Sequence, residues 1–231
     1  MLPISAIFLV LRIPIVRLIF GAGQFDWQAT VLTGRTLAFF SLSIFAQALI
    51  GLISRSFYAL HDTKTPLIIG GFSTVFTIFL STIFIVISSN GALANQFATS
   101  FRLIPRGVEG IAFAYSIAGI INLIVLLIYL NRKIGGIFSR ESFILPQIKI
   151  FLASFFMAIA LYIPIKLLDQ LVFDTTKTIN LLLLTGISSF AGLSLYLFLT
   201  WLFNVKEATT FLLLFKRIGN WKDILERSNK L

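Results

Sequence analysis

Few side chains in this sequence could do chemistry, and their spacing does not form a catalytic centre. His61 is the single histidine, and it falls in a predicted turn where a lone histidine is usually solvated. Cysteine is absent, which removes thiolate catalysis, disulfides and Cys-ligated metals. The nine Asp and Glu residues lie at the ends of apolar segments or outside them, and no glycine-rich phosphate loop occurs. The sequence therefore predicts a protein that is not an enzyme and has no metal and no cofactor.

The remaining candidates are polar residues within long apolar segments, where burial is costly unless they are paired or face water. Arg12 lies about midway along the first segment. It either faces an aqueous cavity that holds an anionic lipid head group or snorkels to an interface, helped by a kink at Pro14. Gln47 and Asn122 are deep in later segments and are either interhelical hydrogen-bond partners or ligands. We take Arg12, Gln47 and Asn122 as the candidate substrate-binding residues.

Composition indicates which elements position these side chains. Hydrophobic residues make up 58% of the chain and charged residues 12%, and the mean hydropathy is +0.96, beyond the usage of soluble domains. Alternation typical of barrel strands is missing. The predicted fold class is all-α, a polytopic membrane bundle with about six transmembrane helices. They are expected at residues 2–20, 37–60, 66–88, 110–130, 148–168 and 179–203.

The formal net charge of +10 does not indicate nucleic-acid binding, because the basic residues are spread between and after the apolar segments. One set of loops with the C-terminal tail carries twelve of them, and the opposite set carries six. The richer side should be cytoplasmic, with both chain ends inside a bacterial cytoplasmic membrane. Arg55 would anchor this topology near the cytoplasmic interface. The tail, 205–231, is expected to be a basic interfacial segment that meets anionic membrane lipids.

The turn motif after the second predicted helix resembles a motif of a known protein family. The stretch RTLAFFSLSIFAQALIGLISRSFYALHDTKTP, residues 35–66, resembles the MurJ/MviN family of the MOP exporter superfamily. PIVRLIFGAGQFD, residues 14–26, and GIAFAYSIAGIINLIVLLIYLNRK, residues 110–133, are similar to two further family segments. The residues that match the family's turn are Phe57, Tyr58, Ala59, Asp62, Thr63, Thr65 and Pro66.

The resemblance implies the C-terminal half of a MATE-like, fourteen-helix flippase that moves lipid II, a lipid-linked peptidoglycan precursor, by alternating access. Residues 1–133 would be four helices of the C-terminal lobe, and 134–204 an appended pair bordering a groove for the polyprenyl tail. The family's cavity arginines lie on earlier helices. Sodium binding is not expected, because Thr77, Ser81 and Tyr115 stand where stronger ligands would be needed.

The abrupt apolar start after Met1, with no cleavable signal peptide, predicts a chain that begins inside a longer reading frame. Its partners would be lipid II or another undecaprenyl-diphosphate-linked precursor, membrane lipids, and a separately encoded N-terminal half. Two other functions stay open at this point. One is a polysaccharide-lipid flippase of the same superfamily, and the other is a non-transporting membrane remnant or a scaffold for cell-wall enzymes.

Overall fold

The computed structural model describes residues 1–21, 25–89, 107–135, 145–171 and 178–203, and every element in them is an α-helix. Five helices are long and apolar enough to cross a membrane, or six if the bent pair α1–α2 counts as one span. These findings confirm the all-α membrane fold. The elements are α1 (Leu2–Val10), α2 (Arg12–Phe20), α3 (Trp27–Ala59), α4 (Lys64–Ser89), α6 (Val108–Ile134), α7 (Leu145–Leu171) and α8 (Thr178–Leu202).

The first predicted span is not one straight helix. It breaks at Leu11, and the axes of α1 and α2 differ by 74°. Pro14 explains the position of the break, because its ring clashes with the carbonyl four residues earlier, which belongs to Val10, the last residue of α1. Each half has nine residues and is about 14 Å long, so neither crosses the roughly 30 Å hydrocarbon core alone.

The second helix begins ten residues earlier than the predicted segment 37–60, so the prediction is wrong for residues 27–36, which belong to α3. Asp26 sets the true start, because its Oδ1 accepts a hydrogen bond of 2.7 Å from the backbone N–H of Ala29. This is the usual way a side chain caps a helix N-terminus. The other helices lie within a few residues of the predicted segments. The predicted interfacial tail lies outside the described residues.

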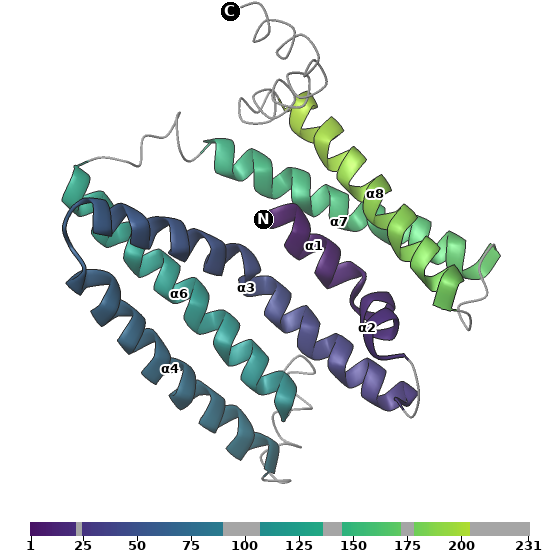
Figure 1. Ribbon diagram of the computed structural model, residues 1–231, viewed down its shortest axis with the longest axis horizontal. Helices are drawn as coiled ribbons and strands as arrows, with labels where there is room; N and C mark the ends of the chain where they lie inside the picture. The colour runs from purple at the N-terminus through teal and green to yellow at the C-terminus, as the bar shows by residue number, and fades with distance from the viewer. Residues whose placement is uncertain (22–24, 90–106, 136–144, 172–177, 204–231) are drawn as a thin grey trace, which may run out of the picture.

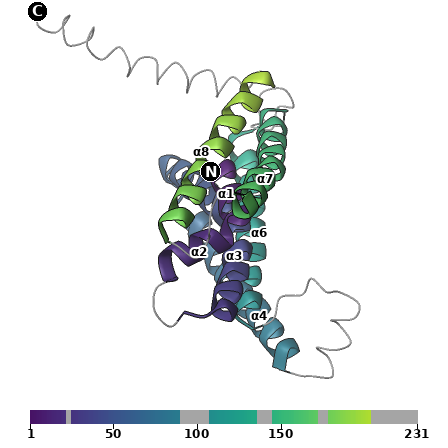
Figure 2. The same ribbon diagram turned by 90° about the vertical axis from the view of Figure 1, so that its right-hand side faces the viewer.

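The helices form two groups joined by the broken segment (Figure 1). In one group α6 lies between α3 and α4, and in the other α7 packs against α8. The broken segment connects them, since α1 contacts α3 and α7 while α2 contacts α3 and α8 (Figure 2). Close packing of α3 on α6 uses small side chains. Ala112, Ala114 and Ala118 are buried there, and the Ser116 hydroxyl donates to the Phe39 carbonyl over 2.6 Å.

A cluster of buried hydrophobic side chains lies at the α3–α6 contact. Phe57 is its biggest member and is 1% exposed. Its α6 side consists of three leucines on one helix face. The cluster contains Ala46, Ile53, Phe57, Leu123, Leu126 and Leu130. It holds α6 and the end of α3 in fixed register, and so positions the turn that follows α3.

Candidate functional site

The turn between α3 and α4 combines a helix stop with a helix start. His61 adopts φ 57°, the left-handed conformation that ends many helices. The His61 N–H donates to the Tyr58 carbonyl and the Asp62 N–H to the Phe57 carbonyl, both over 3.0 Å, which is the Schellman pattern. Asp62 then caps α4, because its Oδ1 accepts a hydrogen bond of 3.1 Å from the N–H of Thr65. These hydrogen bonds end α3 and begin α4, so the chain reverses at the DTKTP motif.

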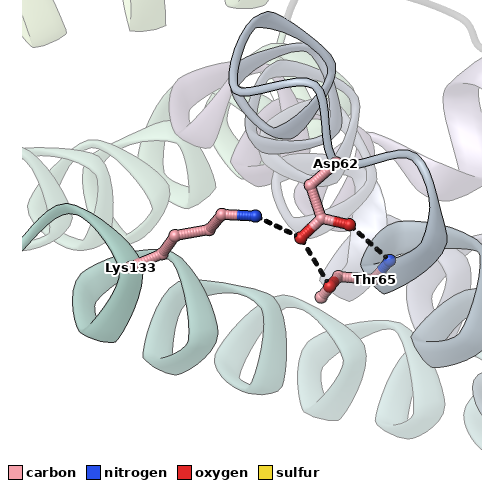
Figure 3. A network of polar contacts seen from close by, with 3 residues as sticks. All are labelled: Asp62, Thr65 and Lys133. Atoms are coloured by element: carbon pink, nitrogen blue, oxygen red, sulfur yellow. Dashed lines mark hydrogen bonds and ion pairs between the residues drawn. The ribbon is translucent and has the colours of Figure 1, made fainter.

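Asp62 also ties this turn to the end of α6. Its Oδ2 accepts hydrogen bonds from the Thr65 hydroxyl and from the Lys133 ammonium, over 2.7 Å and 2.5 Å (Figure 3). The Lys133 ammonium and then the two Thr65 donors hold the pKa of the Asp62 carboxyl well below its usual value. One carboxylate thus connects the ends of α3, α4 and α6.

The other motif residues divide between packing and exposure. Phe57 is in the core, and Pro66 is buried in the first turn of α4. Arg55 is exposed, as an interfacial anchor would be, and Tyr58 and Thr63 line a pocket between helices.

That pocket, called here the polar pocket, lies between α3, α4 and α6 and has a volume of about 840 Å³. It brings together Gln47 of α3 and Asn122 of α6, two of the three candidate substrate-binding residues. Gly119 makes room for Gln47, because a Cβ on that glycine would lie 2.8 Å from Gln47 Nε2. The lining residues are Gln47, Ser54, Tyr58, Thr63, Lys64, Pro66, Leu67, Gly70, Gly71, Ser73, Thr74, Thr77, Tyr115, Gly119 and Asn122.

Asn122 has a side-chain oxygen without a hydrogen-bond partner among the described residues. Its Oδ1 is buried, and no donor among the described residues reaches it. A buried acceptor without a partner is costly, more so where lipid replaces water. Thr77 and Tyr115, which stand where stronger sodium ligands would be needed, also line the pocket. Among the residues that the structure describes, His, Cys, Asp and Glu form no group of three that could hold a metal ion. The polar groups that line the pocket are amides, hydroxyls and the Lys64 ammonium.

Arg12 lies in a different cavity and is not brought together with Gln47 and Asn122. This second cavity, called here the arginine cavity, has a volume of about 540 Å³ and lies between α1, α2, the start of α3, α7 and α8. Arg12 begins α2 directly after the break and donates weakly to the Leu9 carbonyl over 3.3 Å. Arg17 shares the cavity, with its guanidinium 5.7 Å from the centre of the Trp27 ring. Sequence reasoning missed Arg17 as a site residue, although two arginines five residues apart in one apolar segment could have indicated it.

The long apolar helices define a multi-pass helical membrane protein, and two pockets lie between those helices. The sequence profile described as "Lipid II flippase MurJ" matches residues 1–185. This chain belongs to that family.

Individual relatives agree with the family assignment. "Probable lipid II flippase MurJ" of Rhizobium meliloti (strain 1021) is 32% identical over 166 residues, which are 71% of this chain and 27% of the relative. "Lipid II flippase MurJ" of Thermosipho africanus (strain TCF52B) is 29% identical over 154 residues, 66% of this chain and 26% of the relative. A solved structure, "Lipid II flippase MurJ, inward closed conformation", superposes with a TM-score of 0.58 at 25% identity. That match covers 84% of this chain and 35% of the solved one. The chain thus spans about a quarter of the curated relatives' length.

Proposed function

We propose that this chain forms the C-terminal helices of a lipid II flippase in the bacterial cytoplasmic membrane, and that it needs further helices to transport. The observation that carries the proposal is the polar pocket between α3, α4 and α6, in a chain whose relatives are named lipid II flippases. A lipid flippase must shelter the polar head of its substrate from hydrocarbon during the crossing. Amide and hydroxyl groups at membrane depth supply part of such a shelter.

Within this proposal Gln47 and Asn122 contribute to the wall along which the head group of lipid II, or of another undecaprenyl-diphosphate-linked precursor, passes. The side-chain amides of Gln47 and Asn122 line this wall, and amide N–H groups can donate to a sugar hydroxyl or a peptide carbonyl. The chain changes no covalent bond of its substrate, so it is a transporter and not an enzyme. Alternating access requires two bundles that move against each other.

The organisation proposed for the chain assigns residues 1–133 to the C-terminal lobe, 134–204 to an appended helix pair and 205–231 to a basic tail. Contacts between α7 and α8, and between α3, α4 and α6, support this grouping. The twelve-to-six asymmetry of basic residues supports a topology with both ends in the cytoplasm and α1–α2 counted as one crossing. A phosphatase fused after Leu231 should then be inactive, and activity of that fusion in the periplasm would overturn the topology.

Complementation tests the function. A bacterial strain depleted of its own lipid II flippase should grow when it expresses this chain joined to, or together with, the earlier helices of a relative, and should lyse with the chain alone. In the rescuing combination Gln47→Leu and Asn122→Leu should slow growth, because each removes a polar group from the pocket. Gln28→Leu is the matched control, since Gln28 is exposed at the start of α3. Equal growth of all three variants would show that the polar pocket does not contribute to transport.

A further inference from the structure

The described residues that line the arginine cavity include two cationic side chains and no anionic one. Arg12 and Arg17 both line it, and both are half-buried. Ion pairs in the described part of the chain join Arg35 to Glu109 and Lys133 to Asp62, and neither cavity arginine has such a partner. A half-buried cation among apolar side chains is costly unless an anion or water neutralises it. Among the described residues, no anionic side chain neutralises the two arginines of this cavity.

Apolar side chains form the rest of the cavity wall. Leu9 and Ile13 face it from the broken segment, Ala158 from α7, and Leu181 and Leu184 from α8. The two leucines of α8 are at most 5% exposed, so this wall is fixed by packing. An occupant must then combine one small anionic group with hydrocarbon.

Aromatic residues at the rim place the anionic group at a membrane interface. Trp27 and Tyr162 line the cavity and are about 60% exposed, Trp27 59% and Tyr162 62%. Tryptophan and tyrosine gather at the level of lipid head groups. The Trp27 ring also lies beneath the Arg17 guanidinium, which fixes the direction of that cation.

We propose that the arginine cavity binds an anionic phospholipid of the bilayer, with its phosphate between Arg12 and Arg17 and an acyl chain against α7 and α8. A phosphodiester carries one negative charge, and two guanidinium groups can satisfy its oxygens with paired hydrogen bonds. The cavity offers few groups for the many hydroxyl and amide groups of a sugar–peptide head, which favours a phospholipid over the transported precursor. The bound lipid bridges the broken segment to α7–α8. This inference goes beyond the proposed function and does not depend on transport.

Lipid retention by the purified chain tests the proposal. The chain is purified in a mild detergent, mixed with phosphatidylglycerol or phosphatidylcholine, and the bound lipids are counted by native mass spectrometry. We expect one phosphatidylglycerol to bind at least about tenfold more tightly than phosphatidylcholine. The double variant Arg12→Gln/Arg17→Gln should lose this preference, and Arg12→Lys/Arg17→Lys should keep most of it.

Two controls separate a built site from general attraction to a basic protein. Arg35→Gln/Arg55→Gln removes the same charge at exposed positions outside the cavity and should leave the preference unchanged. Ala158→Phe fills the apolar wall with both arginines intact and should weaken retention several-fold. Helix content and monodispersity of each variant are checked first, and the lysine and Ala158 variants keep the test decisive if the glutamine variant unfolds.

Three results would overturn the proposal. The first is an equal loss of phosphatidylglycerol in the exposed-arginine control, which would mean non-specific attraction. The second is unchanged retention in the glutamine or Ala158 variant. In the third, added undecaprenyl diphosphate displaces the bound phosphatidylglycerol at a lower concentration than added phosphatidylglycerol does. That result would assign the cavity to the transported precursor.

Discussion

Replacement of Phe57 by alanine tests whether the α3–α6 contact is the core that organises the described helices. In a water-soluble protein this change costs both a transfer term and a cavity term. In a membrane the transfer term is smaller, because the ring of a separated helix would still be partly covered by lipid. The cavity term remains, since Phe57 is 1% exposed and its neighbours are held by two long helices.

The magnitude follows from the volume lost. Phenylalanine to alanine removes about 100 Å³, and at about 24 cal/mol per Å³ of cavity this destabilises the fold by about 2 kcal/mol. The measurement is reversible unfolding of the purified chain in mixed micelles, titrated with sodium dodecyl sulfate and followed by circular dichroism. Leu52→Ala is the control on the same helix, because Leu52 is 58% exposed, and it should change stability by less than about 0.5 kcal/mol. Equal effects of the two variants would refute the packing inferred for α3 and α6.

Other predictions concern the turn and the second helix group. His61→Gly should raise the free energy of unfolding by roughly 0.5–1 kcal/mol, because glycine adopts the left-handed conformation at φ 57° without strain, and a loss of stability would contradict this. The lowered pKa of the Asp62 carboxyl predicts a contribution to stability that is complete above about pH 4 and is lost as pH falls through the folded-state pKa. Thermal melts from pH 6 to pH 2 should show this loss, and Asp62→Asn should flatten the dependence of stability on pH. Asp62→Ala should lower the folded yield without altering lipid preference, and an altered preference at normal yield would show that the turn binds substrate. Gly192→Ala should destabilise the α7–α8 pair by about 1–3 kcal/mol, because its Cβ would lie 2.8 Å from Leu161 Cδ2; an unchanged unfolding midpoint would show that Leu161 moves freely.

Hydropathy predicted most of the fold because lipid leaves a chain little choice but helices of sufficient length. It fails where polar residues are compatible with a helix, because the helix predicted from residue 37 begins at Trp27, directly after Asp26. It also missed the extent of the break in the first span. Pro14 was expected to allow a kink, but a bend of 74° depends on how α2 packs against α3 and α8.

The candidate site was predicted only in part, because spacing along the chain does not reveal which helices are neighbours. Gln47 and Asn122 are 75 positions apart, and only the packing of α3 on α6 brings them into one pocket. Arg12 was grouped with them by its polarity alone, and the structure places it in the other cavity beside Arg17. The capping role of Asp62 was predictable, since it depends on residues three positions apart. Its bond to Lys133 was not, because that lysine comes from the far end of α6.

Transport by the reconstituted chain tests the proposed function most directly. Liposomes that contain only the purified 231-residue chain should show no transbilayer movement of lipid II above that of protein-free vesicles. Liposomes that also contain the earlier helices of a family member should show it, because the second moving bundle is then present. Clear flipping by the chain alone would contradict the proposal that it needs those helices, and no flipping by the combination would contradict the proposed function.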